Sequence, residues 1–371
     1  MQLPPPRLID ASDRNTLDAA LDAAPAGAAV FLLWPATGAP YLARTAALRR
    51  RLKRLLRPRS APSRLLNLRD VARRIEFYPS GSRLESYLTA WQLGRLHLPD
   101  SYRKLLKLRL PPYVKLIRSH AFPRTQITTR LAGARASFFG PFRTRAAAER
   151  FENEFLDLFQ IRRCQEDFVP SPDHPGCIYG EMNRCLRPCQ DIVGVEEYAT
   201  EVDRVSQFLA TSGDSLLHSA AAARDRSSEN LDFEEAARQH EIHRRIEQVL
   251  KLRDELVRDL DHLHGVAVTL SASPGAVDLR FVLAGAWLDS RRFPLGLVDG
   301  RPAPLDRRLR DVVGALEPPR ISLAERQEHL AILARWFYST WRDGEFLPFD
   351  TLDTLPYRKL INAIRRVNAR R

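Results

Sequence analysis

The stretch RCQEDFVPSPDHPGCIYGEMNRCLRPC, residues 163–189, contains every cysteine of the 371-residue chain, namely Cys164, Cys177, Cys185 and Cys189. A chain of this length can bury large hydrophobic cores, so it does not need disulfides to compensate for a small interior. Thiolates gathered in one short segment are instead typical of a site that holds a zinc ion or an iron–sulfur cluster. We therefore interpret the segment as a metal or cluster site.

The spacing of these cysteines, C-x12-C-x7-C-x3-C, does not decide between the two kinds of site. Zinc knuckles usually bring their ligands in C-x2-C pairs, which this segment lacks, whereas a cubane cluster tolerates irregular loops. His174 lies between the first two cysteines and could replace one thiolate in a Cys3His zinc site. A four-cysteine cluster, a four-cysteine zinc site and a Cys3His zinc site therefore all stay open.

The N-terminal sequence MQLPPPRLIDASD, residues 1–13, has no apolar stretch of the kind found in signal peptides. The chain also has no run of about 18 apolar residues that could span a membrane. We therefore expect a cytoplasmic protein without membrane association. Thiols stay reduced in that compartment, which again favours a metal or cluster site over disulfides.

The formal net charge is +13 and the sequence pI is near 10.0. Much of the excess lies in the arginine-rich run LRRRLKRLLRPRSAPSRLLNLRDVARR, residues 48–74. A basic stripe of this kind favours nucleic acid as the partner, although a solvated basic surface is the alternative. The residues that we expect to contact DNA are Arg49, Arg51, Lys53 and Arg54.

The pattern of apolar residues predicts an α/β fold followed by a mainly helical part. The expected regions are a flexible N-terminus (1–25), a small α/β domain (26–105), a β/α region with the four cysteines (106–192), a helical region (193–258) and a C-terminal α+β region with a basic helix (259–371). Within the α/β domain we expect strands at 28–34, 40–44 and 75–79 and helices at 45–56, 65–74 and 82–98. Their order is β-β-α-α-β-α.

Several motifs resemble, in this order, the N-terminal half of UvrC, the incision subunit of bacterial nucleotide excision repair. They are FFGPF (138–142), IRRC (161–164), RCLRPC (184–189) and LDFEEAARQHEIHRRIEQVL (231–250). The resemblance implies a DNA repair protein in which Cys164, Cys177, Cys185 and Cys189 ligate a [4Fe–4S] cluster.

The last of these motifs is similar to the UVR motif of the family. Its apolar residues form a narrow stripe that suits packing against another helix. The resemblance implies a helical hairpin that docks on the helicase UvrB, with Phe233, Ala236 and Ala237 in the contact. The alternative is that the stripe only closes an intramolecular hairpin.

The first domain is similar to the GIY-YIG nuclease domain of UvrC. The resemblance places Tyr41 where the family activates water, and Arg44 and Arg51 where cations stabilise the phosphate. Two positions depart from the pattern: Phe31 replaces a tyrosine, and Ala90 replaces the glutamate that holds the divalent metal. Without that carboxylate the binding of Mg²⁺ is doubtful, and we expect the nuclease centre to be inactive.

The sequence shows no counterpart to the RNase H-like nuclease and helix-hairpin-helix tail of full-length UvrC. In extent it resembles the short Cho-type homologues. We therefore expect a UvrC-like protein that binds DNA and UvrB. Two alternatives are an active endonuclease that incises damaged DNA and a regulatory adaptor that competes with UvrC for UvrB.

Overall fold

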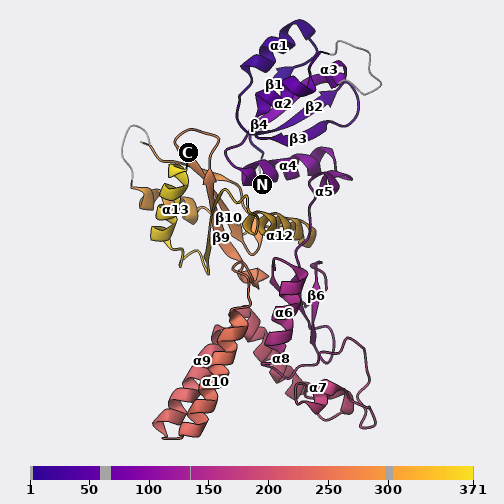
Figure 1. The fold of residues 1–371 in the computed structure, drawn as a ribbon, viewed down its shortest axis with the longest axis vertical. Coiled ribbons are helices and arrows are strands. Elements are labelled where there is room, and N and C mark those ends of the chain that lie inside the picture. Colours follow the sequence, from indigo (N-terminus) through magenta and orange to yellow (C-terminus); the bar gives the residue numbers. More distant parts are fainter. Residues whose placement is uncertain (1–2, 59–67, 134, 297–303, 371) are drawn as a thin grey trace. The chain divides into compact units, whose positions relative to one another are not determined.

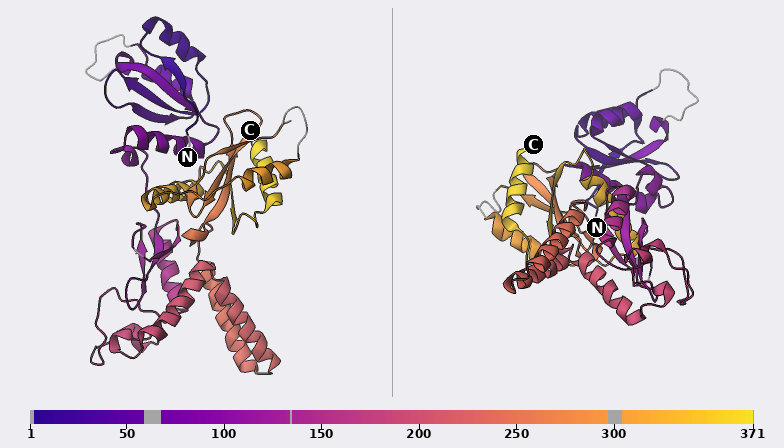
Figure 2. Two further views of the ribbon diagram at one scale, coloured as in Figure 1. Left: turned by 180° about the vertical axis from the view of Figure 1, so that it is seen from behind. Right: turned by 60° about the horizontal axis from the view of Figure 1, so that its bottom comes forward.

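The computed structural model describes residues 3–58, 68–133, 135–296 and 304–370 (Figures 1 and 2). The chain forms two compact units, one made of residues 1–109, 264–319 and 335–371 and the other of residues 110–263 and 320–334. The α/β domain expected at 26–105 and most of the C-terminal region expected at 259–371 therefore belong to one unit. The mixed α/β class is confirmed.

The N-terminal part of the first unit is an antiparallel sheet with helices on both faces. Its strands are β1 (Arg7–Asp10), β2 (Ala29–Pro35), β3 (Tyr41–Thr45) and β4 (Ala72–Pro79), in the order β1-β4-β2-β3. Its helices are α1 (Arg14–Ala23), α2 (Leu48–Leu55), α3 (Leu68–Val71), α4 (Arg83–His97) and α5 (Tyr102–Leu105). Apolar residues of α1 and α2 share a core with Phe31 and Leu33, whereas α4 packs against the opposite face.

Two expectations for this part are wrong. The segment expected to be flexible, residues 1–25, instead contains a paired strand and a packed helix, because β1 pairs with β4 and α1 buries Leu17 and Leu21 against the sheet. Asp13 caps α1 by accepting the N–H of Asn15, which stabilises the start of the helix. The second basic helix, expected at 65–74, is reduced to α3, because residues from Ala72 onward pair with β2 as a strand; residues 65–67 lie outside the described part of the chain.

The C-terminal part of the first unit is a second sheet, ordered β11-β10-β9-β13, with β12 paired to β10. Its strands are β9 (His264–Leu270), β10 (Ala276–Leu283), β11 (Ala286–Trp287), β12 (Arg291–Pro294) and β13 (Gly344–Phe349), and its helices are α11 (Leu305–Gly314) and α13 (Tyr357–Ala369). Every residue of β10 is buried. Leu279 and Phe281 face the core with α11 and α13, so Asp278 and Arg280 lie on the other face.

The second unit contains the sheet β6-β5-β7-β8 and the longest helices. Its strands are β5 (Tyr113–Ile117), β6 (Arg124–Thr128), β7 (Ser137–Gly140) and β8 (Arg258–Asp259). Its helices are α6 (Arg145–Leu156), α7 (Ile178–Glu181), α8 (Val195–Ala210), α9 (Asp214–Glu229), α10 (Phe233–Leu250) and the short η1 (Pro188–Gln190) and η2 (Leu260–His262); α12 (Leu323–Phe337) begins in this unit and ends in the first. Stacked phenylalanines from β7, α6 and α8 fill its core.

Helices α9 and α10 form an antiparallel hairpin, seen as two helices side by side in Figures 1 and 2. The helical region expected at 193–258 contains α8, α9 and α10. Across the described ranges, none of the helices has the length and hydropathy needed to cross a membrane.

Candidate functional site

Strand β3 separates the three residues that the sequence indicates as catalytic. Tyr41 lies opposite Leu33 of β2, on the face covered by α2, and Nη2 of Arg51 lies 3.4 Å from its hydroxyl oxygen. Arg44 is three residues further along the strand and therefore points to the opposite face. There its guanidinium carbon lies 4.6 Å from the centre of the Tyr87 ring on α4. The structure thus brings Tyr41 and Arg51 together and leaves Arg44 apart.

The two altered positions of the nuclease pattern are fully buried. Phe31 and Ala90 are both 0% exposed. A tyrosine hydroxyl or a carboxylate at these positions would need a buried polar partner, whereas phenyl and methyl groups need none. Mg²⁺ takes oxygen ligands from carboxylates and water, and Ala90 offers neither a ligand nor solvent access. These residues do not fit a metal-dependent nuclease centre.

The C-terminal part of the first unit explains why α4 is buried on its outer side. Arg280 of β10 lies 3.4 Å from Glu85 of α4 and 3.6 Å from Asp278. Burial raises the pKa of Glu85, and the charge of Arg280 opposes that rise. Gly81, just before α4, touches the backbone at Ser271 so closely that a Cβ would overlap it. The helix that carries position 90 is therefore held between two sheets.

The basic residues of α2 differ in whether their side chains already have a partner within the protein. Lys53 forms an ion pair with Asp22, and Nε of Arg49 donates to the carbonyl of Ala24 at 2.7 Å. Arg51 and Arg54, together with Arg50, line a cavity of about 300 Å³ at the start of the helix. Of the four expected DNA contacts, two are thus already engaged. Arg50, which the sequence reasoning missed, lies in the same run and takes their place.

The four cysteines gather in one region of the second unit as free thiols. Burial, together with the neighbouring charges of Cys177, Cys164 and Cys189, raises the pKa of Cys185 to about 11. The N–H of Arg187, which donates to Sγ of Cys185 at 3.4 Å, acts in the opposite direction. Among the described residues, however, no group of three or more His, Cys, Asp or Glu side chains is assembled as a metal site. The four cysteines lie in one region, but their side chains do not form a complete metal site.

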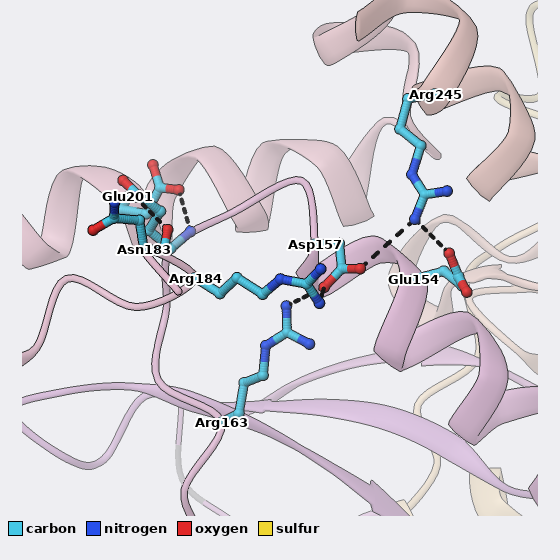
Figure 3. A network of polar contacts seen from close by, with 8 residues as sticks. Glu154, Asp157, Arg163, Asn183, Arg184, Glu201 and Arg245 are labelled. Carbon is cyan, nitrogen blue, oxygen red and sulfur yellow. Dashed lines mark hydrogen bonds and ion pairs between the residues drawn. The ribbon is translucent and has the colours of Figure 1, made fainter. Parts of the chain in front are cut away.

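Asp157, just after the end of α6, forms ion pairs at two points of the cysteine segment (Figure 3). Its Oδ1 accepts from Arg163 at 2.6 Å and from Arg184 at 2.9 Å, and these arginines directly precede Cys164 and Cys185. Arg245 of α10 approaches the other oxygen at 3.6 Å. One carboxylate therefore ties the cysteine segment to the α9–α10 hairpin. No sequence motif pointed to this residue.

Arg162 is a buried cation next to the cysteines, with 1% of its surface exposed. Its Nε donates to the carbonyl of Phe122 and its Nη1 to that of Glu166, both neutral acceptors. Nη1 also lies 3.8 Å from Sγ of Cys164, and Nη2 has no hydrogen-bond partner among the described residues. A buried charge of this kind is costly unless an anion compensates it. The surroundings therefore fit a negatively charged, thiolate-ligated group.

His174 is placed less favourably for metal binding. Its Nδ1 accepts the N–H of Gly176 at 3.0 Å, so that nitrogen is engaged. Its ring packs against Phe168 with 6.2 Å between ring centres. This arrangement favours the four cysteines over a site that includes the histidine.

The tip of the α9–α10 hairpin exposes apolar side chains. Leu231 is 72% and Phe233 is 67% exposed, although Ile246 of the same helix is fully buried. Ala236 is half-buried and Ala237 is exposed. Asp232 caps α10 by accepting the N–H of Glu235, which fixes where Phe233 begins the helix. The intramolecular contacts of the hairpin therefore use its base and leave Phe233 uncovered.

Comparison with known proteins finds a family model that matches part of the second unit. Residues 111–208 match the family model described as UvrC/Cho excinuclease, middle domain. The chain is similar to proteins named UvrABC system protein C from Caulobacter vibrioides (25% identical over 258 residues, 68% of this chain and 40% of that protein), Moorella thermoacetica (25% over 312 residues, 83% and 51%) and Escherichia fergusonii (26% over 268 residues, 71% and 43%). No solved structure matches the chain.

These comparisons confirm the resemblance to the UvrC family. The chain spans about half, or less, of the length of the curated relatives that it matches.

Restoring the missing carboxylate should not restore a metal site. We predict that Ala90→Glu lowers the free energy of unfolding by about 3 kcal/mol or more, because it buries an unpaired charge. Chemical denaturation measures this change. Leu96→Glu is the control, since Leu96 is 65% exposed on the same helix. A folded, stable Ala90→Glu protein that cuts DNA with Mg²⁺ would contradict this reading of α4.

Proposed function

From its relationship to the UvrC family, we propose that this chain is a nucleotide excision repair protein that binds DNA and UvrB and does not itself cut DNA. The observation that carries the proposal is the burial of position 90, where an alanine stands in a helix held on both sides. Phosphodiester hydrolysis of this type needs a metal ion to stabilise the developing charge. Binding needs only cations and docking surfaces, and the chain retains both.

The face made by α2 supports the binding of DNA. Arg50, Arg51 and Arg54 line one cavity, and the described residues of that lining include no carboxylate that would neutralise their charge. Cations in such an arrangement can replace the counterions of a phosphate backbone. The hydroxyl of Tyr41, close to Arg51, offers a further hydrogen-bond donor to a phosphate.

The salt dependence of DNA affinity tests this face. We predict that the double variant Arg51→Gln, Arg54→Gln binds duplex DNA severalfold more weakly and lowers the slope of log affinity against log salt by about two. Fluorescence anisotropy across a salt series measures both quantities. Lys53→Gln is the matched control, because that ammonium group is already paired with Asp22. Equal slopes for the double variant and the control would remove α2 from the DNA-binding surface.

The exposed tip of the hairpin supports docking on UvrB. Large apolar side chains that stay exposed at the end of a helical arm are suited to a groove on a partner. Leu231 and Phe233 are such side chains. Some of the charged residues on the rest of α10 form ion pairs within the helix, as Glu241 and Arg244 do at 2.7 Å. Phe233 is therefore the proposed anchor.

We predict that Phe233→Ala weakens binding to UvrB by roughly 2 to 4 kcal/mol, typical of a buried aromatic hot spot, while the protein stays folded. Phe233 is 67% exposed, so its removal should leave the core intact. Calorimetric titration with UvrB and thermal melting measure the two effects. Ile192→Ala, an exposed apolar residue outside the hairpin, is the control. A Phe233→Ala protein that melts early, or that binds UvrB unchanged, counts against the docking role.

The cysteine region supports a [4Fe–4S] cluster held by Cys164, Cys177, Cys185 and Cys189. The buried cation of Arg162 and the N–H donated to Cys185 are contacts that stabilise negative sulfur ligands. When bound, the cluster would supply a structural link across this loop segment. The residues of the chain orient the segment through the ion pairs of Asp157 and through the hydroxyl of Tyr198, which accepts the N–H of Arg162.

We predict that protein purified without oxygen is brown and that Cys185→Ser abolishes the colour. Arg162→Gln should lower the iron and sulfide content, because it removes the compensating charge. Arg224→Gln, at an arginine of α9 that is paired with its neighbour Asp225, should leave both unchanged. Iron and sulfide assays with visible absorption measure the outcome. A colourless protein with one stoichiometric zinc would favour the zinc alternative instead.

A further inference from the structure

A second cavity of about 520 Å³ lies on the opposite face of β3, within the first unit. The N-terminal part contributes Arg44 of β3 and Ser82, Arg83 and Ser86 at the start of α4. The C-terminal part contributes Arg335 of α12 and the following Trp341 and Asp343. Three arginines therefore meet one carboxylate in this lining. None of the predicted catalytic residues except Arg44 belongs to it.

Two of these arginines hold an uncompensated charge. The guanidinium carbons of Arg44 and Arg335 lie 4.6 and 5.1 Å from the centre of the same Tyr87 ring. Nη1 of Arg335 donates to the carbonyls of Leu106 and Lys107, which are neutral acceptors. In the described part of the chain, no carboxylate forms an ion pair with Arg44. Partial burial, and then the charge of Arg335, lower the pKa of Arg44.

The single carboxylate of the lining is already used elsewhere. Asp343 accepts the backbone N–H of Arg83, which caps the start of α4, and its other oxygen accepts the indole N–H of Trp336 at 3.2 Å. Because both donors are neutral, Asp343 keeps its single negative charge, and the three arginines of the lining outnumber it. Like charges held together in this way are unfavourable unless an anion binds between them. Trp341 adds an aromatic surface of the kind on which bases stack.

The position of this cavity indicates which anion it takes. Thr45, the last residue of β3, lines both this cavity and the smaller one of Arg50, Arg51 and Arg54. The two cationic sites thus adjoin at the end of one edge strand. Successive phosphates of a nucleic-acid strand are spaced to occupy neighbouring sites, whereas a single free anion would use only one.

We propose that the cavity of Arg44, Arg335 and Trp341 binds a phosphate group of a nucleic-acid strand, whose neighbouring phosphate lies against the arginines of α2. The proposal rests on the DNA binding proposed above and assigns a DNA-contacting role to the C-terminal part of the first unit. Arg335 is the specific residue that the C-terminal part adds. Bound in this way, a strand passes over the end of β3 and is held without being cut.

Affinity for a labelled single strand of about 12 nucleotides, within the length that such channels cover, tests the site. Arg335→Gln and Arg44→Gln should each weaken binding about fivefold or more and lower the salt slope by about one. Arg342→Gln is the matched control, because Arg342 contacts the ring of Phe337 and does not line the cavity. It should change the affinity less than twofold.

Thermal melting in phosphate and in chloride of equal ionic strength provides a second readout. Phosphate should raise the melting temperature of the unaltered protein, and Arg44→Gln should lose that response. If Arg335→Gln fails to fold because its contacts with Leu106 and Lys107 are lost, Arg44→Gln decides alone, since its charge makes no such contact.

The outcomes separate this inference from the proposed function. If the unaltered protein binds the strand and both variants bind like Arg342→Gln, the cavity is not a nucleic-acid site, although DNA binding stands. Loss of the phosphate response without loss of strand affinity assigns the cavity to a free anion and overturns the proposal. No strand binding by the unaltered protein overturns both.

Discussion

The ion pair of Arg280 with Glu85 and Asp278 is the interaction on which the first unit depends. Arg280 and Asp278 are buried, and one guanidinium serves two carboxylates, that of Glu85 on α4 and that of Asp278 on its own strand. Removing a partner from such a group is far more costly than the net value of the pair, so the contact fixes how β10 and α4 meet. With Gly81 pressed against Ser271, it holds the start of α4 against the second sheet. Position 90 of that helix lies in a core.

Both positions that depart from the nuclease pattern of the UvrC family are buried. Phe31 and Ala90 carry no polar atoms, which suits positions without solvent. The cations survive, but they serve two separate faces of β3, with Arg51 beside Tyr41 and Arg44 beside Arg335. We propose that these two faces bind phosphates separately and do not form one catalytic group. The α9–α10 hairpin and the cysteine segment lie in the other unit, where the ion pairs of Asp157 join them.

Local sequence patterns predicted the elements well and their partners poorly. The strands of the sheet around Phe31, the helix α6 and the hairpin α9–α10 follow from apolar periodicity, which is a property of a few consecutive residues. The strand β1 was missed because RLID is short and owes its conformation to pairing with β4. The cysteines were visible as a pattern, but Asp157, Arg162 and Arg335 act through contacts between residues distant in sequence. Such contacts leave no local signal.

The central claim is that this chain holds DNA without cutting it. The most direct measurement is to incubate one labelled duplex with the purified protein and Mg²⁺ or Mn²⁺, and to follow binding and strand integrity in the same samples. The account predicts a salt-sensitive complex in which both strands stay intact, with Arg51→Ala weakening the complex and leaving the strands equally intact. Metal-dependent incision that disappears in the Arg51→Ala protein would contradict it.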